Sequence, residues 1–427
     1  MRVAVVGGGY SGTMMAVELV RLGRTDVVLV ERRDRPAAGM AYSTEEGSHF
    51  LNVRADNMSA FADAPDHFAR WAIARGGRPD GFIRRRDYRR YLEELLAQAE
   101  RSGRLKVMRG NAVGLAADAD GIVIALESGA RIGADQAVLA GGNYPGRLPA
   151  ALGLPEERLV HDPWGPDGVK AVKRIASEVE GELLLLGTGL TMVDMSLTLE
   201  DAGFGGRILA LSRRGLVPRA SRQIGAVALA WQPPARLGDL FRELRRRSAE
   251  SGWRSAVDGL RPHSIALWRG FAEAERSRFL RHARPWWDVH RHRIAPEAAA
   301  RIEALKAEGK LEVMAGRILS AEDGRLEIAR RGDGLAERRV EAAINCTGPA
   351  GIGRVEDPLV RQLLANGLAS PDALGLGLAV DAQSRVVGPA EGLYAIGPLT
   401  RGAFWEIVAV PDIRRQIRDV ARAVSAF

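Results

Sequence analysis

The sequence of 427 residues predicts an α/β fold with two glycine-rich strand–turn–helix units and a helical segment inserted into the second unit. The apolar run 3–6 leads into glycines within residues 7–12, and the apolar run 183–186 leads into glycines at 187 and 189. Each run is followed by an apolar pattern with helical period. Residues 218–310 are rich in tryptophan and arginine and also have helical periodicity, which predicts the insertion.

The first unit has the pattern of a dinucleotide-binding turn. Gly7 allows the tight turn, Gly9 lets the backbone approach a pyrophosphate, and Gly12 lets the helix pack close to the strand. The phosphates would lie at the helix N-terminus, where free N–H groups favour an anion. The next apolar run, 27–30, ends in Glu31, where a carboxylate can accept hydrogen bonds from a ribose diol. We therefore predict a Rossmann-like dinucleotide-binding domain here.

The second unit repeats this pattern with two changes. Met192 stands where a third glycine is expected, which alters helix-to-strand packing more than the phosphate contact at Gly187 and Gly189. The next apolar run ends in three polar residues instead of an acid: Ser212, Arg213 and Arg214. A hydroxyl and two guanidinium groups suit a 2′-phosphate, so we predict a second Rossmann-like domain that binds NADP in preference to NAD.

The other segments predict smaller elements. Residues 82–96 place Tyr88, Tyr91, Leu92, Leu95 and Leu96 on one helical face, and residues 105–113, 122–127 and 131–134 alternate like a small antiparallel sheet. Buried runs enter glycine turns at Gly141 and again at Gly397 and Pro398, and residues 405–417 predict a closing helix. These runs predict that the chain crosses between two domains. We place the first domain at 1–160 together with 340–427. We place the second at 175–340, with the insertion 218–310 inside it.

Irregular segments supply further candidate site residues. Long ordered loops often build binding sites, and the loop 47–61 carries the candidate cofactor-binding residues Asn52, Met58 and Ser59. Candidate substrate-binding residues are His161 and Trp164 in a proline-punctuated connector, and Trp405 near the C-terminus.

Composition excludes several classes of protein. The single cysteine, Cys346, excludes a disulfide framework, a cysteine zinc cluster and a dithiol pair, so redox chemistry requires a cofactor. The net charge is +8, but only five of the 61 basic residues are lysines and the arginines are scattered, so we expect no nucleic-acid partner. His290 and His292 have only Asp288 at useful ligand spacing, so we expect no metal site. Short apolar runs and the lack of a signal-peptide pattern predict a cytoplasmic protein without membrane contact.

In combination, the motifs resemble the two-dinucleotide-binding-domain flavoproteins. Within them, the chain is similar to a bacterial family of FAD/NAD(P)-binding proteins that is distantly similar to flavin-dependent monooxygenases. The stretches that carry the resemblance are Val5–Gly12, Phe50–Val53, Met58–Phe61, Leu186–Asp194, Arg291–Pro296, Asn345–Pro349, Tyr394–Pro398 and Trp405–Ile407. Two positions depart from the pattern: Gly397-Pro398 replaces the Gly-Asp of many such proteins, and Arg54 stands where proline is expected.

The resemblance implies FAD in the first domain and NADP(H) in the second. The candidate residues for FAD are Gly7, Gly9, Tyr10, Ser11, Gly12, Glu31, Asn52, Met58, Ser59, Val113, Gly141, Gly397 and Pro398. Those for NADP(H) are Gly187, Gly189, Ser212, Arg213 and Arg214. Because proline replaces the acid at 398, no carboxylate contact to FAD is expected there.

The function implied by the resemblance is that of an FAD-dependent oxidoreductase using NADPH. The leading hypothesis is a monooxygenase, or hydroxylase, in which reduced flavin reacts with molecular oxygen to give a hydroperoxide that oxygenates a small organic substrate. Two alternatives stay open: an NAD(P)H:acceptor flavin reductase or dehydrogenase without oxygen insertion, and a flavin-binding sensor module. The sequence names no catalytic acid or base, no substrate and no oligomeric state.

Overall fold

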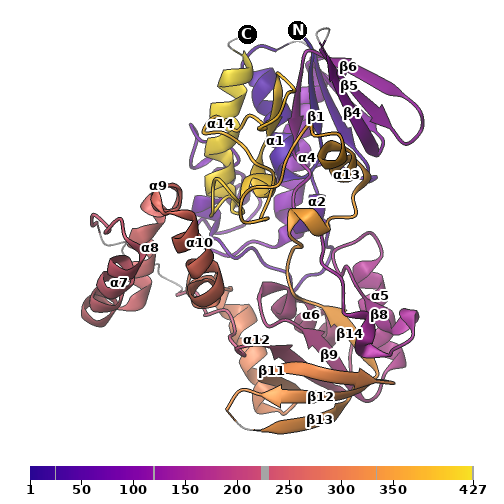
Figure 1. Ribbon diagram of the computed structural model, residues 1–427, viewed down its shortest axis with the longest axis vertical. Coiled ribbons are helices and arrows are strands. Elements are labelled where there is room, and N and C mark those ends of the chain that lie inside the picture. Colours follow the sequence, from indigo (N-terminus) through magenta and orange to yellow (C-terminus); the bar gives the residue numbers. More distant parts are fainter. Residues whose placement is uncertain (25, 119–120, 223–229, 333, 426–427) are drawn as a thin grey trace.

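The computed structural model describes residues 1–24, 26–118, 121–222, 230–332 and 334–425. Figure 1 shows two α/β bodies, one toward each end of the long axis, with a group of helices beside them. Both chain termini lie on the first body. Residues 223–229 of the predicted insertion lie outside the described residues.

The first domain is built on a five-stranded sheet of order β15-β7-β1-β2-β3, in which every neighbouring pair is parallel. Its strands are β1 (Val3–Val6), β2 (Val27–Glu31), β3 (Leu105–Arg109), β7 (Gln136–Leu139) and β15 (Leu393–Ala395). All four residues of the central β1 are buried, as expected for a parallel strand covered on both faces.

The prediction of one antiparallel strand over 105–113 is wrong. β3 pairs in parallel with β2, and the antiparallel sheet contains only three later strands: β4 (Ala112–Asp118), β5 (Gly121–Leu126) and β6 (Arg131–Ala134). The chain leaves β3 before Gly110, so one apolar run supplies strands to two sheets. Alternation alone does not identify the partner of a strand.

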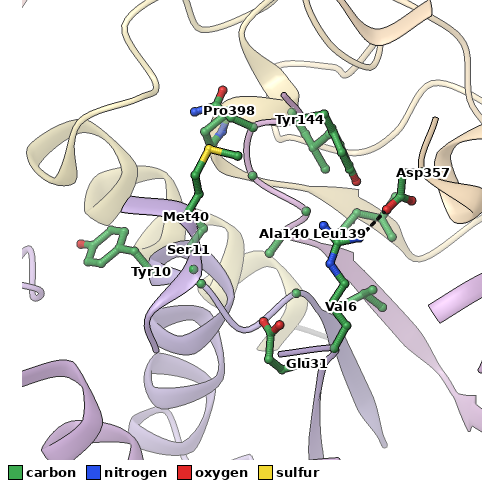
Figure 2. Close-up of a pocket in the computed structure, with 18 of the residues that line it drawn as sticks. Val6, Tyr10, Ser11, Glu31, Met40, Leu139, Ala140, Tyr144, Asp357 and Pro398 are labelled. Atoms are coloured by element: carbon green, nitrogen blue, oxygen red, sulfur yellow. Dashed lines mark hydrogen bonds and ion pairs between the residues drawn. The ribbon is translucent and has the colours of Figure 1, made fainter. Parts of the chain in front are cut away.

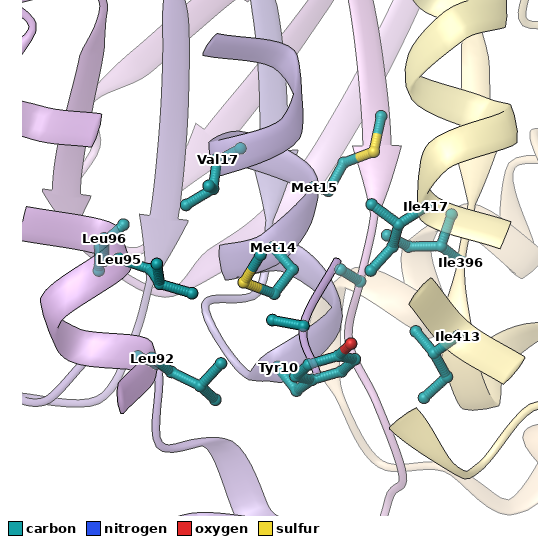
Figure 3. Packing of buried hydrophobic residues seen from close by; sticks show 14 of the residues in the cluster. Tyr10, Met14, Met15, Val17, Leu92, Leu95, Leu96, Ile396, Ile413 and Ile417 are labelled. Carbon is teal, nitrogen blue, oxygen red and sulfur yellow. The ribbon is translucent and has the colours of Figure 1, made fainter. Parts of the chain in front are cut away.

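Helices cover one face of the parallel sheet. α1 lies between α4 and α14, and Figure 3 shows Met14 and Val17 of α1 near Leu92 and Leu95 of α4 in one buried cluster. The antiparallel sheet and α13 pack on the opposite face. The helices of this domain are α1 (Tyr10–Arg21), α2 (Gly39–Tyr42), α3 (His67–Ile73), α4 (Arg85–Arg101), α13 (Pro358–Ala365) and α14 (Val410–Ser425).

The closing helix starts later than predicted. We expected it from residue 405, but 401–409 form turns and α14 begins at Val410. Pro411 stands in its first turn, where the missing N–H has no intrahelical partner to lose. Short helices elsewhere are η1 (Ala55–Asn57), η2 (Ala150–Leu152), η3 (Glu156–Arg158), η6 (Ile352–Arg354) and η7 (Gly397–Thr400).

The second domain is built on a seven-stranded sheet of order β13-β12-β11-β10-β9-β14-β8. Its strands are β8 (Leu159–Val160), β9 (Glu182–Leu186), β10 (Arg207–Ser212), β11 (Leu311–Glu322), β12 (Arg325–Arg330), β13 (Leu335–Arg339) and β14 (Ala342–Asn345). Its helices are α5 (Gly168–Glu178), α6 (Leu190–Asp201) and α12 (Pro296–Ala307).

The sheets place two strands outside the domain to which we assigned them. β8 and β14 both belong to the second sheet, because the buried β14 pairs in parallel with β9 and with β8. The predicted boundaries at 160 and 340 therefore fall on the wrong side of these strands. The mixed α/β class is confirmed: the first sheet is parallel, and in the second sheet β8, β14, β9, β10 and β11 are parallel whereas β12 and β13 pair antiparallel.

A group of helices lies between β10 and β11. It contains α7 (Leu237–Ser251), α8 (Trp253–Leu260), η4 (Arg261–His263), α9 (Ser264–Gly270), α10 (Glu273–Arg278), the π-helical turn η5 (Phe279–Ala283) and α11 (Arg284–Arg291). We call α7 to α11 the helical insertion. Within the described ranges, no helix is both long enough and apolar enough to cross a membrane.

The helical insertion packs against the C-terminal segment of the first domain. Trp268 donates from Nε1 to the carbonyl of Gly402 at 2.8 Å, and Trp287 donates from Nε1 to Glu406 at 2.8 Å. Arg291 also pairs with the buried Glu406 at 2.8 Å. The insertion thus belongs to the second unit by sequence but is also held by the first domain.

The packing of α1 predicts different losses of stability for substitutions at two leucines that lie three positions apart in the sequence. Leu19→Ala removes a side chain with no exposed surface and should lower the free energy of unfolding by about 2–5 kcal/mol. Leu22→Ala, at a position 41% exposed, should cost less than about 1 kcal/mol. Chemical denaturation followed by circular dichroism measures both; equal losses would contradict the packing of α1.

Candidate functional site

The first glycine turn is forced by close backbone contacts. Gly7 has φ +102°, and a Cβ there would lie 2.6 Å from the carbonyl oxygen of Ala140. A Cβ on Gly12 would lie 1.8 Å from the carbonyl oxygen of Gly7. Side chains are excluded at both positions, so the N-terminus of α1 sits directly against the end of β1.

A cavity opens at this turn, at the C-terminal edge of the parallel sheet (Figure 2). Seven of the predicted residues line it: Gly7, Gly9, Tyr10, Ser11, Glu31, Gly141 and Pro398. Further lining residues that we did not predict include Arg32, Arg33, Met40, Ala112, Asn143, Tyr144, Asp162 and Asp357. Ligands of open α/β sheets bind at this edge, so the cavity is in the expected place.

Glu31 holds the turn as well as facing the cavity. Its side chain is buried, with Oε2 accepting from the backbone N–H of Gly8 at 2.5 Å and Oε1 accepting from the N–H of Arg33 at 2.7 Å. A carboxylate oxygen has a second lone pair, so each oxygen can still accept a hydroxyl hydrogen. The carboxylate is therefore oriented for a ribose diol before a ligand binds.

The residues of this cavity fit FAD. Gly9, Tyr10 and Ser11 line the cavity at the start of α1, where a pyrophosphate can approach the backbone, and Glu31 supplies the acceptor for a ribose. In addition, Oδ1 of Asn143 is buried and has no hydrogen-bond partner among the described residues. A buried acceptor without a partner is costly, which favours a ligand that donates to it.

Six predicted residues do not line this cavity. Met58 is buried in the core, and Ser59 is buried with its hydroxyl donating to the carbonyl of Ala64 at 2.6 Å. Ala112 lines the cavity in place of its neighbour Val113, because successive strand residues face opposite sides. The others are Asn52, Gly12, which serves the packing of α1, and Gly397, whose N–H donates to Gln416 at 2.8 Å.

The second glycine turn repeats the geometry of the first. Gly187 has φ +116°, and a Cβ there would lie 2.2 Å from the carbonyl oxygen of Cys346. Gly189 precedes α6 and has open space where a Cβ would lie. The backbone at the start of α6 is therefore accessible to a phosphate, which fits a second dinucleotide.

Ser212 has a structural role that the sequence did not indicate. Its Oγ lies 2.8 Å from Oγ1 of Thr188 and accepts from the N–H of Gly215 at 3.0 Å. Thr188 also donates to the carbonyl of Leu216 at 2.6 Å. The hydroxyl of Ser212 thus ties the second turn to the following loop.

The two arginines after Ser212 differ in their contacts. Arg213 is exposed and has no hydrogen bond or ion pair with any described residue. Arg214 donates to the carbonyl of Arg281 at 3.1 Å. Of the two, Arg213 is therefore the arginine whose guanidinium is free to bind an anion.

Buried polar contacts join the first domain to α6 of the second. Arg85 of α4 donates to Asp194 of α6 at 2.8 Å, and both side chains are mostly buried. His49 lies 2.9 Å from Oγ1 of Thr198 through Nε2 and 2.8 Å from Oγ1 of Thr44 through Nδ1. Because Thr198 donates its own proton to the carbonyl of Asp194, His49 donates from Nε2 and accepts at Nδ1. A neutral imidazole satisfies both contacts.

The candidate substrate-binding residues lie apart from one another. His161 accepts from the N–H of Leu148 at 3.2 Å and serves a structural contact. Trp164 packs beside α6, with Nε1 donating weakly to Thr191 at 3.4 Å. Trp405 stacks on Trp268 of the helical insertion, with ring centroids 4.8 Å apart. None of the three lines the first cavity.

Several lining residues had only a weak signal in the sequence, or none. Asn143 and Tyr144 directly follow the predicted turn at Gly141, so their place after a buried strand was the available indication. Asp357 comes from a distant loop and pairs with Arg32 at 3.0 Å, which no local pattern predicts. Within the described part of the chain, no three histidine, cysteine, aspartate or glutamate side chains gather as a metal site would require.

Comparisons with known proteins agree with this geometry. Residues 4–144 match a family model described as FAD-NAD(P)-binding, which confirms the predicted resemblance over the first domain. No curated protein sequence matches the chain significantly.

Solved structures extend the likeness to the whole chain. An L-lysine 6-monooxygenase from Pseudomonas syringae superposes with TM-score 0.69 at 16% identity, covering 99% of both chains. The ornithine N-hydroxylase of Kutzneria sp. 744, solved with reduced FAD, NADP⁺ and L-ornithine, gives TM-score 0.66 at 16% identity over 99% of this chain and 98% of that one. A thioredoxin reductase from Lactococcus lactis gives 0.55 at 13%, covering 100% and 99%. The chain therefore has the fold of the two-dinucleotide-binding-domain flavoproteins, as predicted.

The His49 contact predicts a pH dependence of stability. Burial lowers the pKa of His49 in the folded protein, whereas the unfolded chain binds a proton near the usual value of about 6.5. The unfolded state thus holds more protons below that pH, and the free energy of unfolding should fall as the pH drops from about 7.5 to about 5.5. Burial lowers the pKa of His67 and His292 in the same direction.

The His49 share of this dependence can be isolated by substitution. His49→Gln should reduce the loss of stability between the two pH values, because one proton-binding difference is removed. His282→Gln, at an exposed position of the helical insertion, is the control and should leave the dependence unchanged. Denaturant titrations at both pH values provide the measurement, and an unaltered dependence in His49→Gln would refute the assignment.

Proposed function

We propose that this protein is an FAD-dependent monooxygenase that uses NADPH to oxygenate a small organic substrate. The observation that carries the proposal is the pair of bare glycine turns, each followed by a helix, which buried contacts from Arg85 and His49 hold in one arrangement. The solved structures with the same fold support the choice of reaction, since two of the three are named as a hydroxylase or a monooxygenase.

The residues of the first domain have assigned roles in this proposal. The backbone at Gly9 and the N-terminus of α1 hold the pyrophosphate of FAD, and Glu31 binds its ribose. Asn143 accepts a hydrogen bond from the cofactor through its unpartnered Oδ1. A bound FAD supplies hydride acceptance and oxygen activation. The overall reaction consumes oxygen, NADPH and a proton and yields oxygenated substrate, water and NADP⁺.

The second domain selects the reductant. Gly189 leaves the start of α6 open for the pyrophosphate of NADPH, and Arg213 binds the 2′-phosphate. Trp268 and Trp287 of the helical insertion bond to Gly402 and Glu406 of the segment 398–408, and in this proposal they keep water from that part of the segment. Water exclusion favours oxygen transfer over release of peroxide.

The reaction with oxygen tests the proposal. Protein reduced anaerobically by NADPH is mixed with air, and absorbance and hydrogen peroxide are followed together. A monooxygenase should reoxidise slowly through a species that absorbs differently from both oxidised and reduced flavin. Immediate reoxidation with peroxide equal to the NADPH consumed would instead identify an NAD(P)H:acceptor reductase. A flavin that NADPH never reduces would identify a sensor module.

Arg213 predicts the preference between the two nicotinamide cofactors. Arg213→Ala should raise the KM for NADPH about 10- to 100-fold, the usual weight of a charge-assisted hydrogen bond, and the KM for NADH less than about 3-fold. Arg207→Ala, an exposed arginine at the other end of β10, is the matched control and should change neither. Steady-state kinetics with both cofactors measure the effect, and equal changes for NADPH and NADH would rule out the 2′-phosphate contact.

A further inference from the structure

The helical insertion contains a second cavity, whose lining is almost entirely apolar. It lies between α7 and α9 and is lined by Leu240, Leu244, Leu267, Trp268, Phe279 and Trp405, among others. The one hydroxyl in the lining belongs to Ser264 and donates to the carbonyl of Leu260 at 3.4 Å. We call this cavity the apolar pocket. Its walls suit a hydrocarbon or aromatic group.

Two buried donors at the pocket have no partner. Nε1 of Trp405, which lines the pocket, and Nε of Arg401 are each buried without a hydrogen bond to any described residue. Arg401 does not line the pocket itself; it donates from Nη2 to the carbonyl of Leu376 at 3.4 Å, and the side chain of Leu376 packs on the hydrophobic cluster that contains the pocket. Leaving buried donors without acceptors is costly, so a ligand that supplies an acceptor is favoured.

The carboxylates around these donors are already engaged. Glu406 accepts from Trp287 and pairs with Arg291. Asp372 accepts from the backbone N–H of Leu374 at 2.9 Å and of Gly377 at 2.5 Å. Asp288 accepts from Arg284 at 3.2 Å. None of these carboxylates accepts a hydrogen bond from Nε1 of Trp405 or Nε of Arg401, so both donors remain open to an acceptor that a ligand brings.

The arginines near the apolar pocket favour a negatively charged ligand. The guanidinium of Arg284 lies over the Trp405 ring, 5.6 Å from its centroid. Burial and the neighbouring Arg284 lower the pKa of Arg401 to about 10, so it remains a cation at neutral pH. A guanidinium with an open donor binds a carboxylate more strongly than a neutral acceptor.

The apolar pocket shares a chain segment with the first cavity. Pro398 and Leu399 line the first cavity, Arg401 and Trp405 follow within seven residues, and Val408 lines the first cavity again. The segment 398–408 thus separates the two spaces, with one side toward each. A ligand in the apolar pocket lies across this segment from the candidate FAD site.

We propose that the apolar pocket binds a small organic acid with an apolar body, whose carboxylate accepts hydrogen bonds from Trp405 and Arg401. The role of this acid as substrate rests on the proposed monooxygenase function, whereas its binding does not. An apolar body distinguishes it from ornithine and lysine, whose side chains end in an amine and which are named for the solved structures of the same fold.

Three probes of matched size test the binding. Isothermal titration calorimetry on the purified full-length protein without NADPH compares 4-phenylbutanoate, 4-phenylbutan-1-ol and 4-phenylbutan-1-amine. The acid should bind at least about tenfold more tightly than the alcohol, and the amine most weakly. Binding of the amine as tight as that of the acid, or no binding by any probe, would overturn the proposal.

Variants locate the site and assign the donors. Arg401→Gln should reduce the affinity for the acid to that of the alcohol, and Trp405→Phe should weaken the acid and the alcohol alike. Leu267→Trp fills the pocket and should abolish binding of every probe. Arg242→Gln, an exposed arginine of α7, is the matched control and should change nothing. Circular dichroism confirms that each variant folds. Unchanged binding in Leu267→Trp, or an unchanged preference in folded Arg401→Gln, would contradict the assignment.

The outcome is independent of the proposed reaction. If the protein binds the acid but its flavin is not reduced by NADPH, the pocket proposal stands and the monooxygenase proposal is contradicted. If the flavin is reduced by NADPH but the protein binds none of the probes, only the pocket proposal is contradicted.

Discussion

The close contact between α1 and β1 at Gly12 is the constraint on which the first domain depends. With a Cβ excluded at 1.8 Å from the Gly7 carbonyl, the helix starts directly over the strand end, and its free N–H groups face the cavity. The same contact lets α1 lie between α4 and α14, so the core and the candidate cofactor site share one geometric requirement (Figure 3). Glu31 contributes electrostatically to the same site, because its carboxylate accepts hydrogen bonds from the turn and keeps lone pairs available for a ligand. The cavity is therefore preformed by backbone geometry.

Two further sets of contacts set this domain relative to the rest of the chain. Arg85 and His49 connect it with α6, which begins at the second glycine turn. Trp268, Trp287 and Arg291 connect the helical insertion with the segment before α14. Both sets are buried and polar, so they specify one arrangement at the cost of desolvation. A reductant at the second turn and a ligand in the apolar pocket would thus each act on the first cavity through a defined connection.

Most of the fold was predictable from local sequence patterns. The dinucleotide-binding motif lies within about thirty consecutive residues, from β1 through Gly7 and Gly12 to Glu31. The turn, the helix and the acid were therefore predictable from one local pattern. Partners far away in the chain were not predictable: β14 pairs with β9, Asn143 and Asp357 meet at the first cavity, and Ser212 is engaged by Thr188. The loop residues Met58 and Ser59 were misplaced because a small polar segment can pack into a core as well as line a site. Trp405 stacks on a tryptophan of the insertion, a pairing that only the tertiary structure reveals.

The most direct test of the central claim is the visible absorbance of the purified protein during anaerobic titration with NADPH. The account predicts a flavin spectrum that bleaches as NADPH is added, because the first turn holds FAD and the second delivers the reductant to it. It also predicts that the released nucleotide is FAD, identified after heat denaturation. A protein that neither carries nor takes up a flavin would contradict the assignment of the first cavity. A flavin that NADPH and NADH both leave oxidised would contradict the assignment of the second turn.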